Sequence, residues 1–111
     1  MSYLSLVQGQ LEAYNNFHLD AFCSFYHSEI TVKSGVQDII LIQGMRDFKI
    51  SYDKVFKSFP NQECILKSRI ILEKCIIDEE LILGRPEHTD GLHAVAIYTF
   101  SDNLIKHVCF Y

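Results

Sequence analysis

The stretch from Ile65 to Leu83 constrains the fold more than any other part of the chain. Its two halves are rich in isoleucine and leucine and meet at a polar turn, Glu73-Lys74, which is the pattern of a β-hairpin. If residues 72 and 75 face each other, the register brings together the pairs Lys67–Glu80, Arg69–Asp78, Ile65–Ile82 and Ile71–Ile76. Pairs of opposite charge framed by pairs of isoleucine are typical of an antiparallel register. The sequence therefore predicts two paired strands over residues 65–83.

The two faces of this hairpin predict which side is buried. One face carries mainly large aliphatic side chains: Leu66, Ile70, Leu72, Cys75, Ile77, Leu81 and Leu83. Burying one such side chain stabilises a protein by about 1.5 to 3 kcal/mol, whereas an exposed ion pair contributes about 0 to 1 kcal/mol. We therefore expect the aliphatic face to point inward and the charged face to point outward. The charged face still carries four isoleucines, so we expect a second copy of the chain to cover it. The expected homodimer face consists of Ile65, Lys67, Arg69, Ile71, Ile76, Asp78, Glu80 and Ile82.

Length and charge exclude several classes of protein. A chain of 111 residues is the size of one domain and can bury a core without disulfides or metals. We therefore treat residues 1–111 as one domain. The net charge is -4 and no run of Lys or Arg exceeds two residues, so we expect no nucleic acid partner. Residues 1–10 lack the features of a signal peptide, and no apolar run is long enough to span a membrane. These observations predict a cytoplasmic protein without membrane contact.

The cysteines and histidines do not suggest a metal site or a cofactor. The four cysteines, Cys23, Cys64, Cys75 and Cys109, are widely spaced and have apolar neighbours. We expect them to be buried free thiols. His88 and His93 lie near Asp90 in a segment rich in turn residues, but no further ligand has a recognisable spacing. We expect neither a bound metal nor a cofactor.

The order of the predicted elements points to an α+β fold. Apolar residues at helical spacing predict helices over residues 2–15, 19–26 and 45–58. Alternating or β-branched stretches predict strands over residues 30–33, 65–72, 75–83, 93–100 and 104–111. Residues 39–42 are a candidate for a short return strand before Gly44. The expected order is helix, helix, strand, helix and then four strands in two hairpins. Helices that come first and strands that come later favour a cone-shaped, curved antiparallel sheet wrapped around three N-terminal helices. Such a cone leaves room for a pocket between its concave face and the helices.

Several short motifs strengthen this expectation because they resemble a known family. They are Tyr14 followed by Leu19-Asp20-Ala21-Phe22; Tyr52, Phe56 and Pro60; Arg69-Ile70 with Ile77-Asp78-Glu79-Glu80 and Gly84; and Ala96-Ile97-Tyr98 before Asp102-Asn103-Leu104-Ile105. Together they resemble the nuclear transport factor 2-like superfamily, in its SnoaL-like and ketosteroid-isomerase-like branch. The resemblance covers almost the whole chain and implies the cone fold, a homodimer formed through the outer sheet face, and an apolar pocket.

The resemblance also implies where catalytic groups would lie. Ketosteroid isomerases use a carboxylate base, a tyrosine and a protonated carboxylic acid. At the matching positions this chain has Ser34, Gln10 and His93. A serine without a partner base cannot remove a proton at neutral pH, so this isomerase mechanism is not expected here.

Two polar residues nevertheless interrupt apolar stripes. Gln10 lies in the stripe of the first helix, and His93 alternates with Val95 and Ile97 in the last hairpin, on a face that we predict also to hold Val108 and Phe110. If both face one apolar pocket, His93 could act as acid, base or orienting donor, and we take it as the candidate catalytic residue. The candidate ligand-binding residues are Gln10, Tyr14, Phe22, Tyr52, Phe56, His93 and Ile97.

Two functions remain open from the sequence. The first is a small-molecule-binding domain with an apolar cavity, with or without isomerase-type or cyclase-type activity. The second is a non-catalytic dimeric module in which His93 is an ordinary core histidine and Gln10 is solvated. The sequence leaves open whether the chain is an enzyme.

Overall fold

Three helices and six strands make up residues 2–111, the part of the chain that this computed structural model describes. The helices are α1 (Tyr3–Asn15), α2 (Leu19–Ser24) and α3 (Met45–Ser58). The strands are β1 (Tyr26–Ser34), β2 (Ile39–Gln43), β3 (Glu63–Ile71), β4 (Cys75–Leu83), β5 (Leu92–Ser101) and β6 (Leu104–Phe110). The predicted α+β class is therefore confirmed. The order of elements differs from the expected one by β2, which forms a full strand between β1 and α3.

The main difference in element boundaries lies between α2 and β1. The sequence predicted a helix through residue 26, but α2 ends at Ser24 and β1 already begins at Tyr26. The reason is tertiary, because the Ile105 N–H donates a 3.0 Å hydrogen bond to the Phe25 carbonyl. This bond draws the chain into the sheet before its helical pattern of apolar residues ends.

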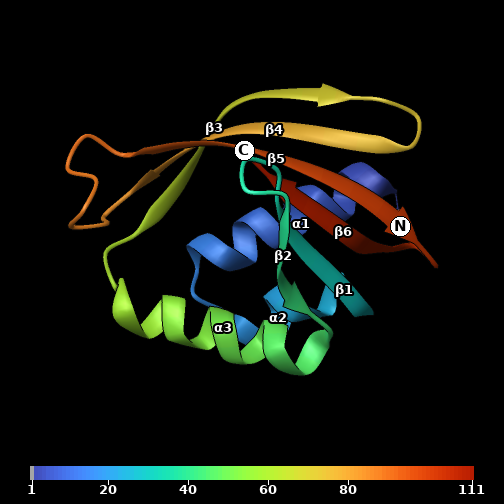
Figure 1. Cartoon of the computed structure of the whole chain (residues 1–111), viewed down its shortest axis with the longest axis horizontal. Helices are drawn as coiled ribbons and strands as arrows, with labels where there is room; N and C mark the ends of the chain where they lie inside the picture. Colours follow the sequence, from blue (N-terminus) through green and yellow to red (C-terminus); the bar gives the residue numbers. More distant parts are fainter. Residues whose placement is uncertain (1) are drawn as a thin grey trace.

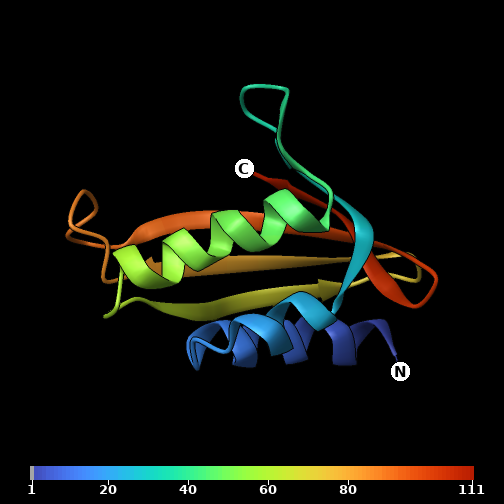
Figure 2. The same ribbon diagram turned by 90° about the horizontal axis from the view of Figure 1, so that it is seen from below.

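The six strands form one strongly curled sheet in the order β2-β1-β6-β5-β4-β3. The helices lie on the same side of the sheet, inside its curve (Figures 1 and 2). Strand pairs are antiparallel except β1 and β6, which are parallel, so the expectation of a wholly antiparallel sheet was wrong at this junction. The chain can join two distant strands in parallel here because the long segment between them contains α3 and the other strands. The turn between β1 and β2 extends away from the body of the molecule (Figure 2).

The register of the β3–β4 hairpin agrees with the prediction near the turn and differs from it farther away. Arg69 pairs with Asp78, and Ile71 pairs with Ile76, as expected. A bulge between Leu66 and Ser68 then shifts the rest of the ladder by one residue. Beyond it the pairs are Leu66–Glu80, Ile65–Leu81 and Cys64–Ile82, so the expected pairs Lys67–Glu80 and Ile65–Ile82 were wrong.

The predicted orientation of this hairpin was also wrong. Ile76, Asp78 and Glu80 are buried, at 1%, 0% and 4% exposure, so the face expected to meet a partner instead faces the helices of the same chain. Ile70, expected inside, is 54% exposed. The reason is that both faces are apolar, and the neighbouring strand decides between them: Asp78 and Glu80 pair with the small residues Ala96 and Ala94, which leave space for the helices.

The β5–β6 hairpin is also turned the other way from the prediction, which placed the His93 face of β5 inward. Ala96 and Tyr98 of β5 are buried against the helices, while His93 is exposed. A shift between Thr99 and Phe100 makes Tyr98 pair with Val108 and Ala96 pair with Phe110. Val108 and Phe110 therefore face inward as expected, but on the face of the alanines and not on that of His93.

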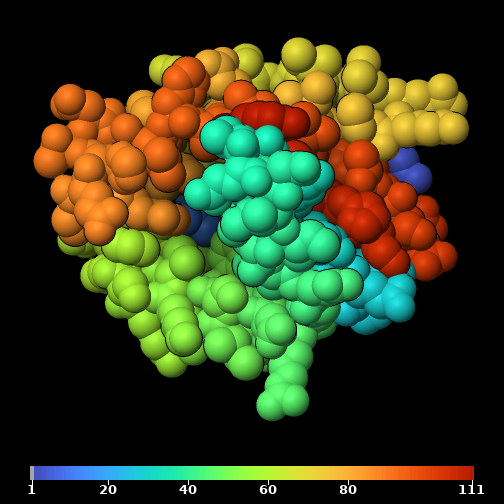
Figure 3. Space-filling model, viewed as in Figure 1, coloured from blue at the N-terminus to red at the C-terminus, as the bar shows by residue number. Residues whose placement is uncertain are grey.

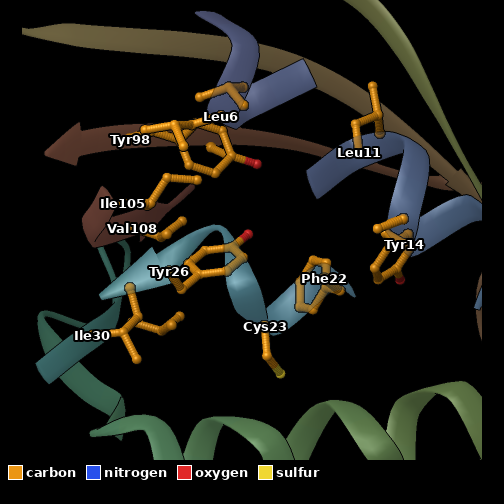
Figure 4. Close-up of a cluster of buried hydrophobic side chains, with 14 of the residues drawn as sticks. Leu6, Leu11, Tyr14, Phe22, Cys23, Tyr26, Ile30, Tyr98, Ile105 and Val108 are labelled. Carbon is orange, nitrogen blue, oxygen red and sulfur yellow. The ribbon is translucent and has the colours of Figure 1, made fainter. Parts of the chain in front are cut away.

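An aromatic cluster joins the helices beneath the sheet. The Phe22 ring lies at its centre, with ring centroids of the neighbouring aromatic residues between 4.8 and 5.8 Å away. These neighbours are Tyr14, Tyr26, Phe48, Tyr52 and Phe56. Figure 4 shows Phe22 and Tyr26 between α3 and the buried side chains of α1 and the sheet. Because the aromatic residues come from α1, α2, α3 and β1, their packing holds the three helices inside the curled sheet.

Candidate functional site

A cavity of about 540 Å³ lies between the concave face of the sheet and the helices. On the face shown in Figure 3, a hollow bounded by the β4–β5 loop (orange), α3 (green) and the β1–β2 hairpin (teal) reaches down to blue atoms of the N-terminal helices. The walls carry side chains from the helices and most strands: Gln10, Leu11, Tyr14, Phe22, Tyr26, Val32, Leu41, Ile42, Ser51, Tyr52, Val55, Cys64, Glu80, Ile82, Arg85, Leu92, His93, Ala94, Tyr98, Phe110 and Tyr111. Most of these side chains are apolar or aromatic, so the cavity is an apolar space with a few polar groups.

A hydrogen-bonded chain of three buried side chains forms one polar part of the wall. The Tyr26 hydroxyl donates to Gln10 Oε1 over 2.7 Å, and Gln10 Nε2 donates to the Tyr98 hydroxyl over 3.2 Å. Gln10 Nε2 also donates to the Val7 carbonyl over 3.0 Å. In Figure 4 both tyrosine hydroxyls point into the space between β1 and β5. Gln10 interrupts the apolar stripe of α1 because it links two strands from within the core.

Glu80 places an ionisable group in the same cavity. Its side chain lies on β4, and the residue is 4% exposed. Burial raises the pKa of this carboxyl from 4.5 to about 7, and the Asp78 carboxylate adds to the rise, while a hydrogen bond from the Cys64 thiol and the charge of Arg69 oppose it. A carboxyl group with a pKa close to 7 can both accept and release a proton at neutral pH.

Asp78, two residues before Glu80, is held differently. Arg69 Nε donates to Asp78 Oδ1 over 2.6 Å, and Nη2 donates to Oδ2 over 2.9 Å. Arg69 Nη1 also donates to Gln8 Oε1 on α1 over 2.9 Å. Arg69 thus links the Asp78 carboxylate on the sheet to α1, so we assign the pair a structural role.

Arg85 and Tyr14 lie together in the cavity wall, with Gln62 beside them. The Tyr14 hydroxyl donates to Gln62 Oε1 over 2.6 Å, and Arg85 Nη2 lies 3.3 Å from the Tyr14 oxygen. Burial raises the pKa of the Tyr14 hydroxyl, and the hydrogen bond and charge of Arg85 oppose that rise. The hydroxyl therefore stays protonated at neutral pH and can donate a hydrogen bond.

Of the seven predicted ligand-binding residues, five line the cavity, His93 only at its edge, and two do not. Gln10, Tyr14, Phe22 and Tyr52 line the cavity. Phe56 packs behind it, with its ring centroid 5.4 Å from that of Tyr14. Ile97 is on the outer face of β5, since its neighbours Ala96 and Tyr98 face inward.

His93 does not occupy the position expected of a catalytic residue. It reaches the edge of the cavity, but its side chain is 64% exposed and its Nε2 lies 2.6 Å from Glu79 Oε2 on the outer face of the sheet. Ser34 accepts a hydrogen bond from the Gln37 N–H in the β1–β2 turn. The three positions carried over from the isomerases therefore do not converge, and the expectation that the His93 imidazole points into the pocket was wrong.

Sequence reasoning missed Glu80, Arg85 and Cys64 as cavity residues. The sequence predicted Glu80 on the outer face of the sheet, and it gave no prediction for Arg85. A signal was present in Ala94 and Ala96, because small side chains on one strand leave room for charged neighbours on the next. Among residues 2–111, no group of three or more His, Cys, Asp or Glu side chains is arranged to hold a metal ion. No helix in the described chain is both long enough and apolar enough to cross a membrane.

The comparisons with known proteins bear on the fold. No family model matches the chain, and no curated protein matches its sequence. Solved structures do match. An uncharacterized cystatin fold protein from Novosphingobium aromaticivorans has a TM-score of 0.89 at 17% identity, covering 100% of this chain and 98% of its own. An NTF2-like protein of unknown function from Cytophaga hutchinsonii has a TM-score of 0.81 at 12% identity, covering 100% of this chain and 89% of its own.

A SnoaL-like protein of unknown function from Burkholderia thailandensis has a TM-score of 0.80 at 14% identity, with 100% of this chain and 97% of its own covered. At these identities the likeness concerns the course of the chain and does not transfer an activity. The chain therefore has the cone fold shared by cystatin-fold, nuclear transport factor 2-like and SnoaL-like proteins.

Proposed function

We propose that this protein binds a small, mainly apolar molecule in the cavity beneath its curled sheet. The cavity volume, about 540 Å³, falls within the range of roughly 300 to 1,000 Å³ found for small-molecule sites. Such sites combine apolar and aromatic walls with a few placed polar groups, and this cavity has that composition. The polar groups are Gln10, Tyr14, Glu80, Arg85 and Tyr98.

The observation that carries a chemical proposal is the Glu80 carboxyl in the cavity wall, with its pKa near 7. At neutral pH a fraction of these carboxyls is ionised and can remove a proton from a carbon next to a carbonyl group. The same group, once protonated, can return the proton to another atom of the ligand. The Tyr98 hydroxyl shares the cavity wall and is a candidate donor to the carbonyl oxygen. We therefore propose an acid–base reaction of the isomerase or cyclase type, with Glu80 in place of the expected His93.

A cyclic ketone tests both the proposed binding in the cavity and the proposed acid–base reaction of Glu80. We would incubate the protein with 2-tetralone in deuterated buffer and follow the exchange of its α-protons by NMR. Wild-type protein is expected to accelerate the exchange above the buffer rate, and Glu80→Gln is expected to abolish the acceleration. The matched control is His93→Ala, which removes a residue at the cavity edge and should leave the exchange rate unchanged. Binding of 2-tetralone without faster exchange would leave a binding protein and remove the acid–base proposal.

The alternative function is a dimeric module, and the outer face of the sheet favours it. This face carries several aliphatic side chains that are at least partly exposed in a single chain: Ile70, Ile77, Leu81, Leu83, Val95 and Ile97. We propose a homodimer through this face, which replaces the face predicted from the sequence. Both proposals can hold together, because the cavity is on the opposite side of the sheet. The four cysteines are unpaired, in keeping with the proposed cytoplasmic location.

A further inference from the structure

We propose that the ligand of the cavity carries a carboxylate or a similar planar anion, and that Arg85 binds it. This inference rests on the proposed small-molecule function and specifies the class of the ligand. It concerns the end of the cavity at the start of the β4–β5 loop, away from the hydrogen-bonded chain around Gln10.

The first observation is the charge of Arg85 in a wall that does not neutralise it. Its guanidinium has only neutral partners among the described residues, Gln62 and Tyr14, and its Cζ lies 4.6 Å above the centre of the Phe59 ring. None of the ion pairs formed within residues 2–111 includes Arg85. Arg69, the other arginine in the interior, is paired with Asp78. A half-buried guanidinium without a counterion favours an anion from outside the chain.

The second observation is the set of donors that remain available. Arg85 Nε and Nη2 make long contacts of 3.2 to 3.3 Å with Gln62 Oε1 and the Tyr14 hydroxyl. Nη1 makes no hydrogen bond within residues 2–111. The N–H groups of a guanidinium form a rigid fork that matches the two oxygens of a carboxylate. Nη1 and Nη2 belong to one fork, and the two contacts of Nη2 are long. A carboxylate can therefore bind both nitrogens without breaking a strong internal hydrogen bond.

The third observation is an unsatisfied amide at the same place. Gln62 is 4% exposed, and its Nε2 is the buried side-chain atom without a hydrogen-bond partner among residues 2–111. Its Oε1 is turned to the donors of Tyr14 and Arg85, which leaves the amide nitrogen without an acceptor. Burying such a donor costs about 1 to 3 kcal/mol. An anion between the guanidinium and this amide would supply the missing acceptor.

The backbone holds these groups together. Gly84 has φ of +86°, and a Cβ at this position would lie 2.4 Å from the Asn61 carbonyl oxygen and 2.7 Å from the Gln62 Cα. Only glycine lets the end of β4 approach the segment before β3 this closely. This approach places Arg85, the next residue, beside Gln62. The site is therefore built by the fold and does not depend on a surface side chain that happens to lie near the cavity.

A pair of matched probes tests the inference. We would measure the binding of 2-naphthoate and of its neutral isostere 2-naphthamide by isothermal titration calorimetry at pH 7.5. Wild-type protein is expected to prefer the carboxylate by tenfold or more. Arg85→Met, which keeps an apolar stem, should lose this preference, and Arg85→Lys should keep part of it because the charge remains without the fork. The control is Arg46→Met, an exposed arginine at the start of α3, which should keep the full preference.

The outcomes distinguish a failure of the Arg85 inference alone from a failure of the proposed small-molecule function. If both probes bind the wild-type protein equally, the Arg85 inference falls and the small-molecule function stands. If the preference survives in Arg85→Met, the inference falls as well. If neither probe binds, the inference and the proposed function both fail. Binding of 2-naphthamide to Arg85→Met shows that this variant is folded, so a loss of carboxylate binding cannot be assigned to unfolding.

Discussion

Arg69 and Asp78, which face each other across β3 and β4, form a two-point hydrogen-bonded ion pair inside a single chain, with the Asp78 side chain fully buried. The pair faces α1, where Arg69 also contacts Gln8. The sequence predicted this pair on the outer face of the hairpin, where a second copy of the chain would cover it. The structure instead places it inside one chain. The pair therefore lies on the concave face of the sheet, on the side of the helices.

Removing one partner of this pair should be costly. We expect Asp78→Asn to lower the free energy of unfolding by about 3 to 5 kcal/mol, because the Arg69 charge would stay in the interior without its counterion. Urea unfolding followed by circular dichroism measures the change. The control is Asp53→Asn, which removes the exposed Lys57–Asp53 pair and should change the stability by less than about 1 kcal/mol. A similar small change for Asp78→Asn would show that the buried pair does not stabilise the fold.

The stability of the protein should depend on the protonation of Glu80. Since burial raises the pKa of this carboxyl from 4.5 to about 7, the folded state binds its proton more tightly than the unfolded state does. The contribution is fully present below pH 4.5 and is lost as the pH rises through 7. We expect this one group to lower the free energy of unfolding by about 3 kcal/mol between pH 4.5 and pH 8.

Glu80→Gln isolates this effect, because the amide has nearly the same shape and does not titrate. Denaturant unfolding of both proteins at several pH values should give a difference in stability that grows in favour of the variant as the pH rises. A difference that stays constant from pH 5 to pH 8 would contradict the raised pKa.

The close approach at Gly84 can be tested against Gly44, a glycine with a similar φ. Gly84 and Gly44 have φ values of +86° and +87°, but a Cβ at Gly44 would meet no atom within 4 Å. Gly44→Ala should therefore lose about 1 to 3 kcal/mol, because φ of +87° with ψ of 154° is a backbone conformation that only glycine adopts readily. Gly84→Ala should lose clearly more, since the added methyl group would overlap the Asn61–Gln62 backbone. Equal losses of stability in the two variants would contradict the proposed role of Gly84.

The proposed dimer predicts different outcomes for two neighbouring isoleucines. Ile77 lies on the outer face of β4, whereas Ile71 pairs with the inward-facing Ile76 at the end of the hairpin and is 57% exposed. Ile77→Asp should give a monomer in sedimentation analysis, because it would place an unpaired charge in the interface. Ile71→Asp should remain a dimer. A wild-type protein that is monomeric at micromolar concentration would rule out the interface.

Local elements were largely predictable because their causes lie within short stretches of chain. The helical spacing of apolar residues predicted α1 and α3, and the Glu73-Lys74 turn predicted the β3–β4 hairpin with its Arg69–Asp78 pair. Five of the seven predicted ligand-binding residues line the cavity, and four of them lie on helices. A residue on the apolar stripe of a helix faces the core whichever way the sheet is turned.

The amino-acid sequence by itself determined the elements, their order and the cone fold. Only the tertiary structure decided which face of the sheet is concave. A strand pattern with a period of two defines two faces but does not rank them when both are apolar. The bulge near Lys67 and the alanines of the neighbouring strand made that choice. Contacts between distant segments likewise placed Glu80 in the cavity and Arg85 beside Gln62, because burial and close approach depend on the whole fold and not on local sequence.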